Sequence, residues 1–360
     1  MKVLLINAKP SLIDALASIE DVEVVAVWPE RHHFKHLTPP TRVPIRYYCG
    51  GRKFNARAVW QLRRIVTTER PEIVHAFYGR ALAHAAMAAT GLRPAPKLIS
   101  FRGIVSKLSK GNVGDWVSYY HPRVDAHACE SEAVRQSLVR SGIDAARCFV
   151  TYNTVYSEAK SRPGRAGLAQ FDIPQDAFVV GTVGTFRRVK GADLLLKAAI
   201  ECADLKDIYW LLIGQVVDPE IHRLAADQRI ASRVRLVGHR PDAAELISGA
   251  DLFVMPSRSE ALCQALLEAM QQGLCPIVSD AGGMKEVVRD GVDGIVVPQE
   301  HVNHLAKAIH KLYADRAGRD QFATSSQRRV QDQYTAEKMA RRLVAVYEGF
   351  RAVKVCGEAA

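Results

Sequence analysis

The chain has 360 residues, of which 48% are hydrophobic and 24% charged, a composition typical of a soluble globular protein with room for two domains. Its seven cysteines form no C-x-x-C pair, which argues against a zinc site and favours reduced thiols. No apolar run approaches a membrane span, and the chain enters a strand at Val3–Ile6 without a signal peptide, so we expect a cytoplasmic protein.

Nearly all of the net charge of +11 lies in the first half of the chain. Residues 1–155 hold 22 Lys and Arg against 12 Asp and Glu, a net +10. No acidic residue occurs from Arg31 to Thr68 or from Ile73 to Gly114. A field of this sign attracts a polyanion, so the candidate partners are anionic lipid, phosphorylated glycolipid or nucleic acid.

Apolar strand-like segments alternate with helical ones from end to end, which predicts two doubly wound α/β units. In the first half we expect strands near 2–6, 22–27, 72–75, 97–101, 125–129 and 148–151. In the second half we expect them near 178–183, 208–213, 233–237, 251–255, 275–278 and 294–297. Residues 157–175, rich in Pro, Gly, Arg and Ala, are interpreted as the linker, and 336–350 as a last helix.

The segment 55–69 is predicted to be a basic amphipathic helix. Its apolar face comprises Ala58, Val59, Leu62, Ile65 and Val66. Arg57 and Arg64, seven residues apart, share another face, with Arg63 nearby. Such a helix can rest on an anionic membrane, although an ordinary domain helix with a solvated basic face has the same pattern.

The most informative segment begins at Glu260 and ends at Glu268. We predict a helix over 261–272, closed by Gly273, so that the two carboxylates lie two turns or roughly 12 Å apart along its axis. The free N–H groups of residues 262–264 would lie between them and suit a phosphate. Carboxylates on either side suit hydroxyl groups. Sugar, diphosphate and ribose in a row form a sugar nucleotide.

At these residues the chain resembles the retaining glycosyltransferases of the GT-B fold, specifically glycosyltransferase family four, also described as glycosyl transferases group 1. The resemblance covers most of residues 178–298, and the first half resembles the family loosely. The segments that carry it are Val183–Gly191, Trp210–Gly214, Val237–His239, Ala250–Ser257, Glu260–Glu268 and Gly282–Glu286.

This resemblance implies two Rossmann-like domains facing a cleft. Residues 1–156 would bind the acceptor, residues 157–335 the nucleotide sugar, and the helix within 336–360 would return to the first domain. The implied enzyme moves a sugar, with retention and without a metal, from a nucleoside-diphosphate sugar to a glycan or glycolipid, as in lipopolysaccharide or polysaccharide biosynthesis. Neither half carries a G-x-G-x-x-G fingerprint, so no cofactor is expected beyond the donor.

The resemblance also implies roles in the second domain. In the loop that starts at Gly184, Lys190 would neutralise the departing diphosphate together with Arg187 or Arg188, since Thr185 stands where relatives carry an arginine. Glu260 would face the donor sugar and Glu268 would bind the ribose.

Three further residues of this domain are candidates for nucleotide contacts. The backbone of Leu262 and Cys263 would lie near the phosphates, and we interpret the Cys263 thiol as a packing group rather than a nucleophile. Arg240 follows the loop that lines the base in relatives, where it either contacts the base or is solvated.

First-domain candidates for acceptor binding are Lys9, in a loop that lacks the family's glycines, and Arg102, at the end of a predicted strand. His75 is the best candidate for a catalytic histidine, with a satisfied core histidine as the alternative. Phe77 stands where relatives often carry a second histidine.

Other functions remain open at this point. A sugar-nucleotide epimerase or a phosphorylase shares the implied fold. A nucleic-acid-binding protein would need stacking aromatics among the cations, for which Tyr47, Tyr48, Phe54 and Trp60 are the local candidates. The charge of the first domain favours peripheral binding to the inner face of an anionic membrane, with no nucleic acid as partner.

Overall fold

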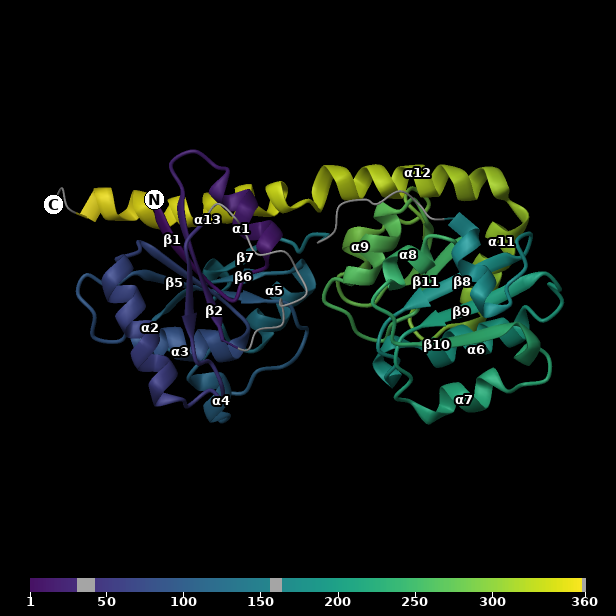
Figure 1. Ribbon diagram of the computed structural model, residues 1–360, viewed down its shortest axis with the longest axis horizontal. Coiled ribbons are helices and arrows are strands. Elements are labelled where there is room, and N and C mark those ends of the chain that lie inside the picture. Colours follow the sequence, from purple (N-terminus) through teal and green to yellow (C-terminus); the bar gives the residue numbers. More distant parts are fainter. Residues whose placement is uncertain (31–42, 156–163, 358–360) are drawn as a thin grey trace. The chain divides into compact units, whose positions relative to one another are not determined.

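The computed structural model describes residues 1–30, 43–155 and 164–357, with side chains up to residue 350. Two compact units emerge from it (Figure 1). The first comprises Met1–Asn153 and Ala336–Ala360, and the second Thr154–Thr335. In the described part of the chain each unit has one parallel sheet with helices packed on it, so the predicted α/β class is confirmed.

The sheet of the first unit has the strand order β3-β2-β1-β4-β5-β6-β7, and all neighbouring pairs are parallel. The strands are β1 Lys2–Ile6, β2 Glu23–Pro29, β3 Ile45–Tyr48, β4 Ile73–Phe77, β5 Lys97–Arg102, β6 Val124–Cys129 and β7 Cys148–Val150. The order reverses between β1 and β4, as in a doubly wound sheet. Strand β3 was not predicted, because Arg46 and Tyr47 are exposed in it and leave no apolar run.

The helices of the first unit are α1 Pro10–Ala17, α2 Ala56–Glu69, α3 Gly79–Ala89, α4 Val113–Trp116, α5 Glu132–Arg140 and α13 Ala336–Gly357, with a 3-10 turn η1 at Ala145–Arg147. Helix α13 packs against α1. Its buried residues Leu343 and Tyr347 join a core with Leu5 and Ile13. The last helix of the chain therefore completes the core of the first unit.

Helix α2 begins one residue after Asn55, whose side chain accepts a hydrogen bond from the Ala58 N–H. Leu62 and Val66 of the predicted apolar face are buried against the unit, so this face is not free to meet a membrane. Arg63 is not part of a free basic face either, because its guanidinium donates to the carbonyls of Ala88 and Thr90, at 3.0 and 2.7 Å. These bonds satisfy carbonyls at the end of α3.

All six strands predicted for the second unit are present. They are β8 Phe178–Val183, β9 Ile208–Ile213, β10 Val234–Gly238, β11 Leu252–Met255, β12 Cys275–Ser279 and β13 Ile295–Val297. The sheet order is β10-β9-β8-β11-β12-β13, again parallel throughout. The order reverses between β8 and β11.

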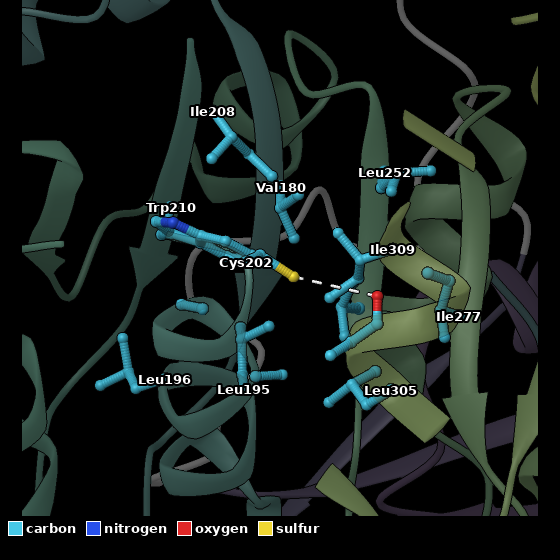
Figure 2. Packing of buried hydrophobic residues seen from close by; sticks show 14 of the residues in the cluster. Val180, Leu195, Leu196, Cys202, Ile208, Trp210, Leu252, Ile277, Leu305 and Ile309 are labelled. Carbon is cyan, nitrogen blue, oxygen red and sulfur yellow. Dashed lines mark hydrogen bonds between the residues drawn. The ribbon is translucent and has the colours of Figure 1, made fainter. Parts of the chain in front are cut away.

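The helices of this unit are α6 Ala192–Glu201, α7 Pro219–Ala225, α8 Ala243–Ile247, α9 Gln264–Gln271, α10 Met284–Val287, α11 Val302–Ala314 and α12 Arg316–Gln333, with 3-10 turns η2 Gly164–Phe171, η3 Arg188–Lys190 and η4 Ala231–Arg233. Figure 2 shows the apolar core, where Trp210, Leu195 and Ile309 pack between the sheet and its helices. The Cys202 Sγ atom lies 3.8 Å from the Ala306 carbonyl oxygen in this core.

Part of the predicted linker belongs to the second unit. Residues 157–163 lie outside the described residues, whereas Leu168 in η2 is buried. A Cβ added at Gly249 would lie 3.0 Å from the Leu168 side chain, which shows how closely η2 packs on this unit. No helix in the described part of the chain combines the length and the apolar composition that crossing a bilayer requires.

Candidate active site

The candidate site lies at the carboxyl ends of β8 and β11, where the strand order of the second sheet reverses. Open α/β sheets bind their ligands at such a switch point. The loop 184–191 follows β8, and the loop 256–263 follows β11 and leads into α9. The predicted donor residues Gly184, Lys190, Glu260 and Glu268 all belong to these two loops and to α9, so the fold brings them to one edge of one sheet.

The two loops touch through their backbones. Gly191 has φ +70°, and a Cβ there would lie 1.9 Å from the Pro256 carbonyl oxygen. The Arg258 N–H donates to the Val189 carbonyl at 2.8 Å. Glycine is required at residue 191 both for the left-handed backbone and for the close approach.

An ion pair connects the side chains of the two loops. Lys190 Nζ donates to Glu260 Oε2 at 2.7 Å, and the Ser257 hydroxyl lies 3.4 Å from the same oxygen. The side chains are partly buried, with 26% of Lys190 and 14% of Glu260 exposed. The residue predicted to neutralise the leaving group is therefore paired with the residue predicted to face the sugar.

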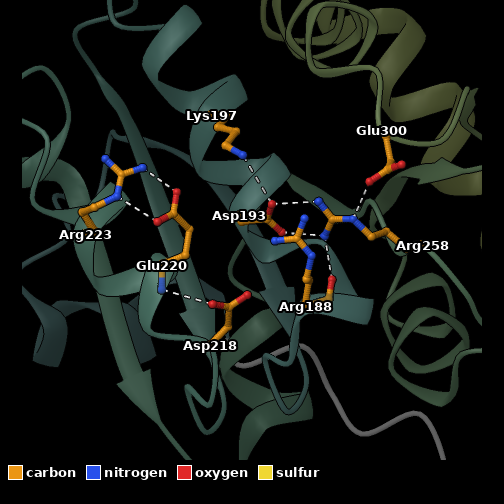
Figure 3. A network of polar contacts seen from close by, with 8 residues as sticks. All are labelled: Arg188, Asp193, Lys197, Asp218, Glu220, Arg223, Arg258 and Glu300. Atoms are coloured by element: carbon orange, nitrogen blue, oxygen red, sulfur yellow. Dashed lines mark hydrogen bonds and ion pairs between the residues drawn. The ribbon is translucent and has the colours of Figure 1, made fainter.

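Arg258 holds the backbone of the Lys190 loop through hydrogen bonds of its side chain (Figure 3). Its guanidinium forms a bidentate pair with Asp193, at 2.7 and 2.8 Å, and donates to Glu300 through Nε at 2.7 Å. The same group donates to the Arg188 carbonyl at 2.6 Å. Burial alone would raise the pKa of Asp193, but the hydrogen bonds and charge of Arg258 outweigh it and hold that pKa below its usual value.

Sequence reasoning missed this Arg258–Asp193 pair. A signal was present, since Asp193 stands among apolar residues at the start of a buried helix, where a carboxylate needs a partner. The partner is 65 residues away in the chain. Sequence spacing could not identify it.

Helix α9 begins later than predicted. It starts at Gln264 after Cys263, so the N–H groups without an intrahelical acceptor are those of Gln264, Ala265 and Leu266 rather than residues 262–264. Those of Ala265 and Leu266 lie near the Cys263 sulfur. The reason is tertiary, because the Glu260 carbonyl accepts a hydrogen bond from the Gly283 N–H at 3.2 Å instead of starting a helix.

Glu268 consequently lies about one turn into α9 rather than two. It stays near the helix start, and Gln264 Nε2 donates to its Oε1 atom at 3.0 Å. Leu262 and Cys263 precede the helix with buried side chains. Burial raises the pKa of Cys263 to about 12, which keeps this thiol protonated and fits the packing interpretation rather than a nucleophile.

The other predicted cations of this unit differ in their surroundings. Arg187 and Arg188 are both exposed on the Lys190 loop. Arg240 forms a bidentate pair with Asp242 at 2.8 and 2.7 Å. Its contact with the base stays a prediction.

Of the two interpretations of His75, the structure favours the core histidine over the catalytic one. It is fully buried in β4, its Nδ1 atom lies 2.6 Å from the Tyr347 hydroxyl, and its ring stacks on Phe77 at 4.5 Å. Burial lowers the pKa of His75 to about 3. Tyr347 of α13 covers this face of the sheet, and no local pattern around His75 shows that cover.

The first-domain cations also differ from expectation. Arg102 is buried and donates to the Ser106 carbonyl and hydroxyl at 3.1 and 2.8 Å, with its guanidinium 4.6 Å from the centre of the Tyr119 ring. It holds a loop in place and does not present its charge to an acceptor. Lys9 lies partly buried at the start of α1, where the structure leaves its predicted role open.

The fold and the site place the protein in the GT-B class. Its second unit is doubly wound and carries the loops 184–191 and 256–263 where the strand order reverses. Residues 11–158 match the sequence family described as Glycosyltransferase Family 4, and residues 168–329 match Glycosyl transferases group 1. The chain belongs to this glycosyltransferase family, which confirms the resemblance seen in the sequence.

The curated relatives are glycosyltransferases as well. The lipopolysaccharide core biosynthesis glycosyltransferase LpsE of Rhizobium meliloti is 31% identical over 170 residues, 47% of this chain and 49% of LpsE. The chain spans about half the length of the curated relatives it matches.

Two solved structures share the fold over nearly the whole chain. HepE of Anabaena, in complex with UDP-glucose, aligns with a TM-score of 0.79 at 20% identity, covering 97% of this chain and 100% of HepE. The lipopolysaccharide outer core galactosyltransferase WaaB aligns with a TM-score of 0.71 at 15% identity, covering 97% and 100%.

Proposed function

We propose that this protein is a retaining glycosyltransferase that moves a sugar from a nucleoside-diphosphate sugar to a hydroxyl of a glycan or glycolipid. The observation that carries the proposal is the meeting of Lys190, Glu260 and the start of α9 at the switch point of the second sheet. HepE, which shares the fold, binds UDP-glucose, so we take a uridine nucleotide as the first donor to test.

In the proposed reaction the bond between the anomeric carbon and the β-phosphate oxygen breaks, and the acceptor oxygen bonds to the same face of that carbon. The acceptor proton passes to the departing diphosphate. Lys190, with Arg187 or Arg188, stabilises the growing negative charge on the diphosphate, in place of a metal ion. The N–H groups of Gln264, Ala265 and Leu266 add helix-end donors for a phosphate.

The carboxylates hold the two ends of the donor. Glu260 accepts hydroxyls of the sugar, and Glu268, about one turn into α9, accepts those of the ribose. The buried and protonated Cys263 offers no nucleophile, which favours direct transfer over a covalent intermediate at this residue.

For the acceptor we propose a lipid-linked glycan of the cell surface, as in lipopolysaccharide biosynthesis, held by the first unit. The similarity to LpsE and the fold shared with WaaB support this pathway. Of the predicted first-unit contacts, Lys9 remains a proposal, whereas Arg102 and His75 are withdrawn.

We further propose that the protein works in the cytoplasm as a peripheral protein on the inner face of the membrane. The net +10 of residues 1–155 supports this location. A lipid-linked acceptor would require the enzyme to meet the bilayer.

Thermal unfolding in the presence of UDP, GDP, ADP and their sugar conjugates tests the proposed donor. A ligand at 100 times its dissociation constant should stabilise the second unit by about 2.7 kcal/mol.

Lys190→Ala should lower kcat by several hundredfold, on the order of 3–4 kcal/mol, with a smaller rise in donor KM, because the lost contact strengthens toward the transition state. Activity should survive EDTA. Product analysis that finds an epimerised donor without any acceptor would instead identify an epimerase.

A further inference from the structure

The site contains a negative partner for the lysine that the donor is expected to use. Lys190 Nζ and Glu260 Oε2 lie 2.7 Å apart, and both side chains are largely withdrawn from solvent. A diphosphate that binds Lys190 therefore meets a carboxylate that already accepts a hydrogen bond from it. The sugar, in turn, needs that same carboxylate.

Hydrogen bonds hold the backbone on both sides of this pair, which favours a change of partner by movement of side chains. Arg258 holds the carbonyls of Arg188 and Val189, one through its side chain and one through its N–H. Asp193 in turn holds Arg258 (Figure 3). On the other loop, the Glu260 carbonyl accepts from the Gly283 N–H, and a Cβ at Gly282 would lie 1.9 Å from that carbonyl oxygen.

Resting on the proposed function, we propose that Glu260 occupies Lys190 in the free protein as a stand-in for the donor diphosphate, and that the diphosphate takes Lys190 over on binding. The exchange releases the Glu260 carboxylate to accept the hydroxyls of the donor sugar. Recognition of the sugar is thereby coupled to arrival of the diphosphate.

Charge decides the direction of this exchange. A diphosphate carries more negative charge than one carboxylate and offers more oxygens to the ammonium group, so Lys190 gains by changing partner. Glu260 then stands beside an anion and is stabilised only when hydroxyl donors of the sugar reach it. A nucleoside monophosphate, which lacks the second phosphate, leaves the original pair largely in place.

Titration calorimetry with UDP and UMP tests the exchange in the wild-type protein, Glu260→Gln, Lys190→Ala and the double variant, with GDP or ADP and their monophosphates used if the thermal screen selects them. Glu260→Gln should tighten UDP binding about threefold to tenfold, as expected for removing a competing part-buried ion pair, and UMP binding much less. In the Lys190→Ala background the gain should be clearly smaller, because no ion pair competes with UDP there and only the repulsion between Glu260 and the diphosphate is relieved. Glu220→Gln makes the same chemical change on α7 and should leave UDP affinity unchanged.

The outcomes separate the exchange from the proposed function. If the wild-type protein binds none of the nucleotides, the proposed function fails. If it binds UDP but Glu260→Gln weakens or does not alter binding, Lys190 serves both partners at once and the exchange is overturned. An equal gain in the Lys190→Ala background would show plain repulsion by Glu260. Glu260→Gln should also reduce the preference for UDP-glucose over UDP, because the sugar loses its carboxylate.

Discussion

Single residues in this protein derive their chemistry from what covers them. His75 and His127 are both buried in the first sheet, and burial lowers the pKa of each to about 3. In the unfolded chain a histidine has a pKa near 6.5. Between these values the unfolded state takes up a proton that the folded state refuses, so each histidine contributes stability that is complete above about pH 6.5 and is lost as pH falls toward 3.

We therefore predict that the first unit loses about 1.4 kcal/mol of unfolding free energy per pH unit for each of the two histidines between about pH 6 and 4. His75→Gln retains a partner for the Tyr347 hydroxyl. It should reduce the slope by about 1.4 kcal/mol per pH unit, the contribution of one bound proton. Urea unfolding at a series of pH values measures it. An unchanged slope in the variant would mean that His75 does not resist protonation.

The same residues show where sequence reasoning stops. That Lys190, Glu260 and Glu268 lie at one edge of one sheet could be predicted, because they belong to short segments whose order along the chain is informative. For His75 the sequence left open a catalytic residue or a core histidine, and the deciding cover comes from α13, more than 250 residues later. For Arg240 it left open a base contact or a solvated side chain, and its ion pair with Asp242, two residues away, does not decide between them.

At the scale of elements, a strand could be predicted from the sequence where it forms a continuous apolar run. All six strands of the second unit are parallel, and β8, β9, β11 and β12 consist mostly of buried residues whose apolar runs predict them directly. Strand β3 is a half-exposed edge strand with no such run. The first residue of α9 could not be predicted, because the Gly283 N–H that binds the Glu260 carbonyl comes from a different loop.

The loop that joins β8 to α6 depends on one glycine. Gly191→Ala forces an unfavourable φ and a Cβ at 1.9 Å from the Pro256 carbonyl, so it should destabilise the second unit by about 2–4 kcal/mol and weaken UDP binding. Gly349→Ala is the matched control, since Gly349 is an exposed residue within α13 with open space for a Cβ.

That control should stabilise the first unit by about 0.5–1 kcal/mol, because alanine favours the helix. Urea unfolding and calorimetry on both variants give the comparison. Gly191→Ala with wild-type stability and wild-type UDP affinity would show that the contact between the two loops is dispensable.

At the scale of the whole molecule, charge and exposed aromatic groups gather in the first unit. With the apolar face of α2 buried, the side chains available to a bilayer differ from those predicted. Trp60 of α2 and Trp116 of α4 are 60% and 48% exposed, and the Arg64 guanidinium lies 6.0 Å from the Trp60 ring centre. Lys53 Nζ donates to the Gly114 carbonyl at 2.7 Å and so ties the segment before α2 to α4.

This arrangement revises how the proposed membrane contact would form. Trp28 and Trp210 are buried, so Trp60 and Trp116 are the two exposed tryptophans of the chain. Tryptophan favours the boundary between water and lipid, and nearby arginines favour anionic head groups. Insertion should therefore shift tryptophan fluorescence to shorter wavelength with anionic vesicles and not with neutral ones.

Co-sedimentation with vesicles of phosphatidylglycerol and phosphatidylcholine measures the binding itself. Each Lys or Arg near the surface contributes about 1 kcal/mol, so Arg57→Glu with Arg64→Glu should weaken binding to anionic vesicles by more than about tenfold, and salt should release the wild-type protein. Trp60→Ser should weaken binding and reduce the fluorescence shift.

The matched control reverses the charge of Arg223 and Arg316, exposed residues of the second unit, and should leave vesicle binding unchanged. UDP affinity should be the same in all of these variants, because the changes lie outside the donor loops. Equal binding to neutral and anionic vesicles, or an identical loss in the control, would refute this surface as the membrane contact.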